Sequence, residues 1–373
     1  MVFLCKKTLV KYKNRINVFV EEGHANKEEW LQYLVHPIRA FWGDGTEEWE
    51  KWEKDFQYYK DYFTITDDIL KSDIGFLPLT LNYYINNRKL GLVDNFAEKL
   101  KKFNKILIAW LDGDNDIRYR HKNCIIIKYS TNKNYNNSNV YIQPADLKND
   151  LLNEYFNGKI NIRNKDTIPS IGFDGMADYP KLKITGTIVK NIIHRLSYII
   201  FQTQYVPDPI APNLMKRKRI LNYLKKKSSI KTDFKIRDSF AAGIYPENIN
   251  ARKEYVNNII SNDYTFCYRG TANYSLRLYE TLCLGRIPLF IDTQCVLPLE
   301  RKINWKEICL WVDQSELKFI DKKILDYHKS ISNKEFIEKQ IYCRELWNKY
   351  FSKQGFIKYF FRYLIKIKSK EIL

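Results

Sequence analysis

The stretch from residue 264 to residue 299 constrains the fold most, because it predicts a strand, a loop, a helix and a second strand in that order. Residues 264–267 are apolar or aromatic and stop at Arg269 and Gly270, a pair suited to a sharp turn. Gly285 is typical of the position after a helix. Pro288 can begin a strand, where its missing amide costs least. We therefore expect a βαβ unit.

The helix of this unit should present one apolar and one polar face. It should begin near Asn273 or Ser275, whose side chains can accept a hydrogen bond from a first-turn amide. Helical spacing gathers one apolar set: Leu276, Leu278, Tyr279, Leu282 and Cys283. The opposite face carries Arg277, Glu280 and Thr281. We expect the apolar face to pack and the polar face to meet a ligand.

The polar residues of this unit predict a nucleotide-diphosphate site. In βαβ units, ligands lie at the carboxyl ends of strands, and helix-start amides favour anions there. The residues expected at this edge are Arg269, Gly270, Ser275, Arg277 and Glu280. A cation and a hydroxyl suit a diphosphate, and a carboxylate one turn on can accept hydrogen bonds from a ribose diol. The alternative is that Ser275 only caps the helix, Gly285 only ends it, and Arg277 and Glu280 form a solvated ion pair.

The order of these residues resembles the exostosin family of glycosyltransferases. The matching pattern is Arg269-Gly270, then Ser275-x-Arg277-x-x-Glu280-x-x-x-x-Gly285-x-Ile287-Pro288, then Asp292 and Leu297-Pro298. The resemblance implies an α/β chain of the GT-B type, with two Rossmann-like domains facing across a cleft. It also implies hexosyl or pentosyl transfer from a nucleotide-diphosphate sugar, expected to be a UDP-sugar, to a glycan or glycoconjugate hydroxyl, with inversion at the anomeric carbon.

Length and composition favour two packed domains, since 45% of the 373 residues are hydrophobic and 15% are aromatic. A polar, turn-like stretch near residues 161–169 suggests the boundary. We expect an acceptor-side domain over residues 1–165, a nucleotide-sugar domain over 166–330, and helices over 331–373 that pack back on the first domain.

Two more donor-binding residues follow from the resemblance. Residues 170–175 predict a strand and turn, similar to the Phe-x-Gly that opens the second half of exostosin-like enzymes, and this places Gly175 near the donor. Arg217 or Arg219 begins a predicted helix through residue 224, as an arginine does in that family. A solvated basic face is the alternative for these arginines.

The catalytic base is sought in the first half. A buried strand over residues 106–111 runs into Asp112, Asp114 and Asp116. An Asp-x-Asp pair can share a divalent metal with a diphosphate, or can be an acidic turn. Because the cationic phosphate site follows much later, we expect neither a metal nor another cofactor, and we take Asp112 and Asp114 as base candidates ahead of Asp44 and His36. Metal-dependent transfer stays the alternative.

The formal charge of +19 implies anionic partners: nucleic acid, acidic lipid or phosphorylated small molecules. Biased codon usage can also enrich Lys together with Asn and Ile. A nucleic-acid-binding protein is the alternative from another class, but no basic-aromatic module is visible, so we expect no nucleic acid. The marks of nicotinamide-dinucleotide, P-loop, zinc-protease and nucleophile-elbow hydrolase sites are absent.

Two further helices bear on location. Residues 187–201 predict an apolar helix interrupted by His194 and Arg195, followed by an exposed proline-rich loop. The tail carries an apolar stripe and a basic stripe, which predict packing on the first domain or, alternatively, docking on an anionic membrane. The seven scattered cysteines indicate reduced thiols. With no leader or spanning segment visible, a cytoplasmic chain is expected.

Overall fold

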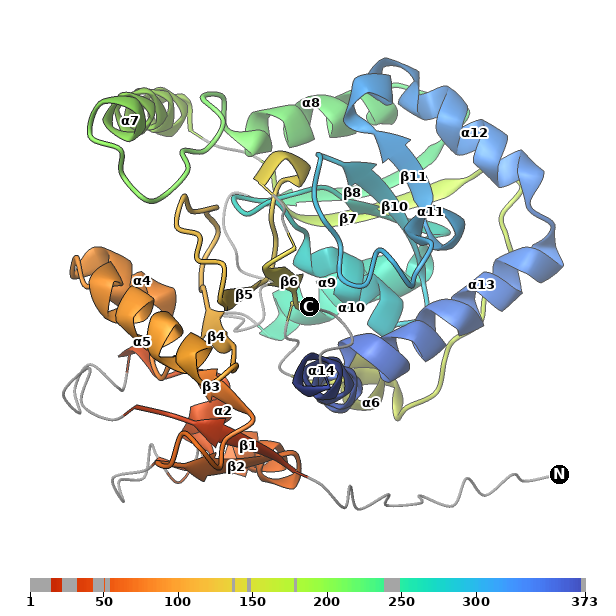
Figure 1. Cartoon of the computed structure of the whole chain (residues 1–373). Coiled ribbons are helices and arrows are strands. Elements are labelled where there is room, and N and C mark those ends of the chain that lie inside the picture. Colours follow the sequence, from red (N-terminus) through yellow and green to blue (C-terminus); the bar gives the residue numbers. More distant parts are fainter. Residues whose placement is uncertain are drawn as a thin grey trace, which may run out of the picture.

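In the computed structural model, which describes residues 15–21, 32–42, 50, 54–135, 138–145, 149–177, 180–237 and 249–369, two sheets of parallel strands are flanked by helices (Figure 1). The first sheet has the order β2-β1-β3-β4-β5-β6. Its strands are β1 Ile16–Phe19, β2 Phe63–Thr66, β3 Ile74–Phe76, β4 Leu107–Trp110, β5 Cys124–Lys128 and β6 Val140–Ile142. The chain therefore has an α/β fold compatible with two Rossmann-like domains.

The second sheet has the order β11-β10-β9-β7-β8. Its strands are β7 Ser170–Met176, β8 Lys231–Arg237, β9 Tyr264–Cys267, β10 Ile287–Asp292 and β11 Leu310–Asp313. The chain passes from β7 to β8 on one side and then returns to place β9 on the other side of β7. This reversal creates a crevice at the carboxyl ends of β7 and β9.

The helices cover both faces of the second sheet. The helices that precede β7 in the sequence are α2 His36–Arg39, α4 Leu81–Asn86, α5 Leu90–Lys102 and α6 Leu151–Phe156, with short helices η1 Gln57–Asp61 and η2 Lys133–Tyr135. The later ones are α7 Lys181–Ile200, α8 Asn213–Lys225, α9 Ile249–Ser261, α10 Leu276–Cys283, α11 Trp305–Ile308, η3 Gln314–Phe319, α12 Ile320–Ser330, α13 Asn333–Leu346, η4 Trp347–Phe351 and α14 Lys353–Lys368. Apolar residues of α8 and α12 share one core with the sheet, and those of α9 and α10 share another.

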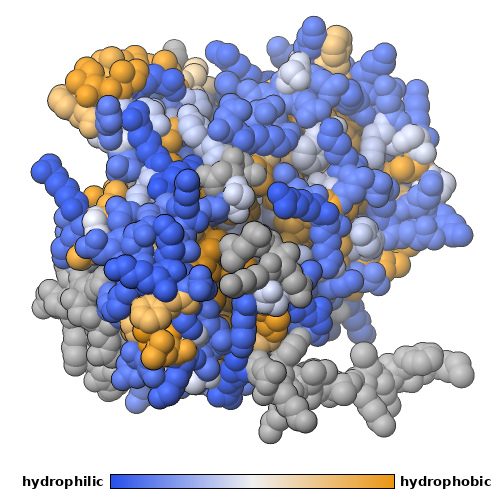
Figure 2. Space-filling view, viewed as in Figure 1, coloured by the Kyte–Doolittle hydropathy of each residue, from blue (hydrophilic) through white to orange (hydrophobic). Residues whose placement is uncertain are grey.

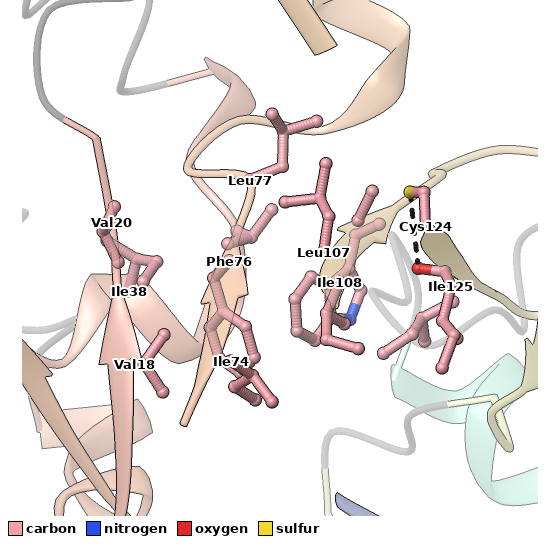
Figure 3. Packing of buried hydrophobic residues seen from close by; sticks show 14 of the residues in the cluster. Val18, Val20, Ile38, Ile74, Phe76, Leu77, Leu107, Ile108, Cys124 and Ile125 are labelled. Atoms are coloured by element: carbon pink, nitrogen blue, oxygen red, sulfur yellow. Dashed lines mark hydrogen bonds between the residues drawn. The ribbon is translucent and has the colours of Figure 1, made fainter. Parts of the chain in front are cut away.

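The first sheet has its own apolar core. Figure 3 shows side chains from neighbouring strands meeting there, among them Val18, Phe76 and Leu107. Aromatic rings pack edge to face inside it, as Phe63 does on Phe76 with ring centroids 5.4 Å apart. This core positions the loop after β4, which carries the acidic run.

The last helix, α14, returns to that first core. Its buried apolar residues are Ile357, Phe360, Phe361, Leu364 and Ile367. The Phe360 ring lies 5.4 Å from that of Tyr141 and 6.2 Å from that of Trp110. The basic residues of the other stripe, Lys358, Arg362 and Lys366, are exposed. The apolar stripe of the tail is thus covered by protein.

Ion pairs and isolated bridges join the two halves of the chain. Both terminal nitrogens of Arg344, in α13, donate to the carboxylate of Asp150, at 2.8 and 2.6 Å. Lys133 contacts Asp292 at 2.9 Å, and an antiparallel bridge joins Asn132 to Cys295 beside this pair. The contacts of Asn132 and Lys133 hold the loop after β5 next to the carboxyl end of β10.

The packing of α14 predicts the effect of a truncation. Phe360→Ala should lower the free energy of unfolding by about 3–5 kcal/mol, because the ring is fully enclosed by aromatic neighbours and leaves a cavity. Urea denaturation followed by fluorescence measures this. Arg362→Ala, on the exposed side of the same helix, should change stability by less than about 0.5 kcal/mol. Equal effects of the two substitutions would contradict this account of α14.

Candidate functional site

A cavity of about 270 Å³ lies in the crevice between the carboxyl ends of β7 and β9. Gly175 and Met176 come from the end of β7, and Gly270 from the loop after β9. Asp114, from the loop after β4, closes the cavity from the side of the first sheet. Both halves of the chain therefore contribute to its wall, at the position where open α/β sheets bind ligands.

Most of the predicted site residues meet in this cavity. Those that line it are Asp114, Gly175, Arg217, Gly270, Ser275, Arg277 and Glu280. Asp112 and Arg269 do not line it. Sequence reasoning did not single out five other polar wall residues: Asp174, Thr271, Tyr274, Arg252 and Tyr255. The only sequence signal that could have pointed to Arg252 and Tyr255 was their i, i+3 spacing on an amphipathic helix.

The start of α10 forms one wall. The predicted helix ends as expected, since Gly285 follows it with φ +64°, a left-handed conformation that favours glycine. At the other end Ser275 occupies the N-cap position, but its side chain makes no capping hydrogen bond. The prediction that this hydroxyl caps the helix was therefore wrong. Ser275, Leu276 and Arg277 line the cavity instead.

The guanidinium of Arg277 is fixed against the end of β7. Its Nη2 donates to the backbone oxygen of Asp174 at 2.7 Å, and the group lies 4.4 Å from the centre of the Phe173 ring. A Cβ atom at Gly175 would come within 2.6 Å of the same Nη2, so only glycine admits this approach. The Nε of Arg277 is buried without a hydrogen-bond partner among the described residues. No carboxylate pairs with this guanidinium among the described residues, so its charge is available to an anionic ligand in the cavity.

Glu280 is almost completely buried, at 2% exposure. Its Oε1 accepts from Nη2 of Arg252 at 2.7 Å, and its Oε2 accepts from the Tyr255 hydroxyl. Burial and the nearby Glu280 carboxylate raise the pKa of Tyr255, so the phenol keeps its proton and donates. The alternative of a solvated Arg277–Glu280 pair is wrong, because the carboxylate pairs with Arg252.

The polar face of α10 is thus less open than predicted. Thr281 is fully buried and donates to the backbone oxygen of Arg277 at 2.6 Å. Glu280 still lines the cavity, and a carboxylate with two bonds retains lone pairs for a ligand. Arg277 and Glu280 are therefore the residues of this face that a ligand can reach.

Arg217 of α8 ties the two central strands together. Its terminal nitrogens donate to the backbone oxygens of Met176 at 2.6 Å, Tyr268 at 3.1 Å and Arg269 at 2.6 Å. Burial, and next the positive charge of Arg277, lower the pKa of Arg217 to about 9, so it remains a cation at neutral pH. The alternative of a solvated basic face fails for this residue, which is 6% exposed.

The three acidic residues of the loop after β4, Asp112, Asp114 and Asp116, differ in position and role. Asp114 is exposed at the cavity wall, and its pKa is raised by the surrounding protein and by the charge of Asp208. Asp112 lies off the cavity and is exposed, with its backbone held by the Asn82 side chain, and partial desolvation by the surrounding protein raises its pKa. Asp116 is structural, because its carboxylate pairs with Lys128 and accepts from Thr131 and from the amide of Asn132.

The remaining candidates lie elsewhere. His36 stacks on Phe56, away from the cavity, and burial with nearby cations lowers its pKa to about 3. Asp44 falls outside the described residues. Arg269 donates to the backbone oxygen of Thr271 at 2.7 Å, and burial lowers its pKa. Among the described residues, no three His, Cys, Asp or Glu side chains are grouped to hold a metal ion.

Part of the chain is similar to known proteins. It is 34% identical to Exostosin-1 of Drosophila melanogaster over 89 residues, which are 23% of this chain and 11% of that protein. It is 32% identical to the probable glucuronosyltransferase 47 A of Physcomitrium patens over 77 residues, 21% of this chain and 16% of that one. No family model matches the chain. The similarity supports a role as a transferase, of exostosin-like glycosyltransferase character.

The buried carboxylate predicts a stability effect. Glu280→Ala should lower the free energy of unfolding by about 3–5 kcal/mol, because it removes the nearest carboxylate from the buried Arg252 cation. Urea denaturation measures the loss. Glu254 is a matched control, since it also pairs with cations but is 49% exposed, and Glu254→Ala should cost less than about 1 kcal/mol. Similar losses for both would show that burial does not set the strength of the Glu280 pair.

Proposed function

We propose that this protein transfers a sugar from a nucleotide-diphosphate sugar, a UDP-sugar by its resemblance, to a hydroxyl of a glycan or glycoconjugate. In this proposal the two halves form the facing domains of a GT-B type enzyme, the first binding the acceptor and the second the donor. The observation that carries it is the guanidinium of Arg277, which is fixed in the cavity wall at the strand-order reversal and has no ion-pair partner among the described residues. The partial similarity to a glucuronosyltransferase supports the same class of reaction.

The diphosphate would lie against the start of α10. Arg277 provides a cation there, Ser275 provides a hydroxyl, and the helix start provides partial positive charge. Gly270 lines the same part of the cavity, and a Cβ placed on it would have no heavy atom closer than Arg217, at 3.7 Å. The ribose would lie one turn further along α10, where the fixed Glu280 carboxylate accepts hydrogen bonds from its hydroxyl groups.

The acceptor would approach from the side of Asp114. A raised pKa brings this carboxylate nearer to neutral pH, which suits a general base. In the proposed step Asp114 takes the proton of the acceptor hydroxyl, the freed oxygen forms the new bond at the anomeric carbon, and the bond to the diphosphate breaks with its electron pair. Arg277 stabilises the negative charge that grows on the departing diphosphate. Attack opposite the leaving group inverts the anomeric carbon.

Arg277 provides the sharpest test of this proposal. Arg277→Lys keeps the charge but loses the planar fork, so turnover should fall about 10- to 100-fold while donor affinity changes little. A thermal-shift screen of nucleotide-sugars identifies the donor, and product formation then gives turnover. If both rate and affinity stay at the parent values, Arg277 has no part in the reaction and the proposal fails.

A glycine pair gives an independent check on the same guanidinium. Gly175→Ala pushes a Cβ against Arg277 and should impair binding of the free nucleoside diphosphate. Gly91→Ala is the control, because Gly91 lies in α5 outside the cavity and a Cβ there would have no heavy atom within 4 Å. We expect thermal shift by the nucleotide to be lost in the first variant and kept in the second. The reverse result would move the diphosphate away from Arg277.

Metal independence is part of the proposal, because Arg277 and the start of α10 would neutralise the charge of the diphosphate. Turnover should therefore survive treatment with EDTA and be unchanged by added manganese. Loss of activity in EDTA with recovery on manganese would instead favour metal-dependent transfer, with Asp112 and Asp114 as the ligands to examine by substitution. Nucleoside-diphosphate binding in EDTA separates loss of binding from loss of chemistry.

A further inference from the structure

Helix α7 exposes an apolar stripe along its whole length. The stripe consists of Leu182, Val189, Ile192, Ile193, Leu196, Ile199 and Ile200, each between 41% and 88% exposed, and continues to Phe201 at 75%. Their spacing by three, four and seven residues places them on one side of the helix. Figure 1 shows α7 at the upper left edge of the molecule, and apolar side chains gather at that place in Figure 2.

The opposite, polar side attaches α7 to the protein. Asn191 is buried there and donates to the backbone oxygen of Pro209 at 2.9 Å. Arg118 donates to the backbone oxygen of Tyr198 at 2.8 Å, and its guanidinium lies 3.7 Å from the centre of that ring. An ordinary surface helix buries its apolar side and exposes its polar one. Since α7 does the reverse, its apolar side forms an exposed patch of the kind that marks an interaction site.

The positive charge around α7 indicates a partner with a negatively charged surface. Between residues 181 and 231 the chain has a single acidic residue, Asp208, and these basic ones: Lys181, Lys183, Lys190, Arg195, Lys216, Arg217, Lys218, Arg219, Lys225, Lys226, Lys227 and Lys231. On the helix, the exposed Lys183 and Lys190 flank one side of the stripe and the exposed Arg195 flanks the other. We propose that α7 docks in the plane of a membrane surface that contains anionic lipids, with its apolar stripe among the acyl chains and these cations at the headgroups.

A second copy of the chain fits this surface less well. Two copies meeting through α7 would bring their basic residues together and repel each other, whereas anionic headgroups neutralise them. Among the described residues no helix is long and apolar enough to cross a membrane, and the contact proposed here is one of surface docking. It does not depend on the proposed sugar transfer.

The position of α7 relates the docking surface to the cavity. The segment after the helix bridges to the loop that carries Asp114: Tyr205 pairs with Ile117, and the amide of Val206 donates to the backbone oxygen of Asp116 at 2.7 Å. Docking through α7 would therefore hold the acceptor side of the cavity close to the bilayer. This last step, unlike the docking itself, rests on the proposed sugar transfer: acceptors carried on a lipid are the class that the placement favours.

Vesicle sedimentation of the full chain, without nucleotide, tests the proposal. Wild-type protein should bind phosphatidylcholine vesicles that contain phosphatidylserine about tenfold or more strongly than vesicles of phosphatidylcholine alone, and added salt should weaken that binding. The combined variant Ile193→Glu, Leu196→Glu, Ile200→Glu should lose most of the binding. Leu70→Glu is the matched control, because Leu70 is 72% exposed in the loop between β2 and β3 and should not matter.

A second set of substitutions removes three positive charges of α7 and leaves its apolar stripe unchanged. Lys183→Gln, Lys190→Gln, Arg195→Gln should weaken binding to the anionic vesicles about tenfold or more and reduce its dependence on salt. Circular dichroism checks that each variant folds. If the glutamate variant does not fold, the combined variant Ile193→Ser, Leu196→Ser, Ile200→Ser replaces it and should show the same loss of vesicle binding.

Three results would overturn the proposal. Wild type that does not sediment with anionic vesicles contradicts it directly, as do stripe variants that bind as strongly as wild type. A wild-type dimer that the stripe substitutions convert to a monomer, with no vesicle binding by either, would assign α7 to a second copy of the chain. Because no nucleotide is present, these outcomes leave the proposed sugar transfer to its own tests.

Discussion

The buried guanidinium of Arg217 joins the carboxyl ends of β7 and β9 at the point where the strand order reverses. Neighbouring strands diverge at such a reversal because their connections leave to opposite sides of the sheet. Backbone oxygens at the ends of both strands need donors there, and one charged fork satisfies three of them. The crevice can then stay open above the fork, and Arg277 takes its place against β7. The shape of the candidate site therefore depends on a residue that arrives from α8, after the long segment that contains α7.

A second constraint is the arrangement of charge around the cavity. The cavity wall carries Arg217, Arg252 and Arg277. The charge of Arg217 is compensated by its hydrogen bonds to backbone oxygens, and that of Arg252 by its ion pair with Glu280. Asp174, buried beside them, is paired with Arg237. Arg277 is thus the cation whose charge is least compensated within the wall. A preorganised charge of this kind needs no rearrangement when an anion arrives, which is the physical basis for assigning it to a diphosphate.

Local patterns predicted the second sheet well, and distant contacts explain what they missed. Strand β9 was predicted with its correct bounds, and Gly285 ends α10 as expected, because burial and turn chemistry act within a few residues. The partner of Glu280 could not be predicted in this way, since Arg252 comes from another helix whose register against α10 is set by packing. The acidic run shows the same limit: spacing placed Asp112, Asp114 and Asp116 on one loop, but only tertiary contacts turn Asp116 inward to Lys128.

The two amphipathic helices show why a sequence pattern cannot decide which face meets the core. Residues of both α7 and α14 combine an apolar stripe with basic neighbours, and the tail was the one considered for a membrane. In the structure α14 buries its stripe against Tyr141 and Trp110, whereas α7 is held by Asn191 and Tyr198 on its polar side. The difference lies in what each helix finds beside it: α14 reaches an aromatic core that needs covering, while α7 meets a loop of backbone oxygens that need donors. A polar surface binds a polar face, and the apolar stripe of α7 is left outward, next to the loop that carries Asp114.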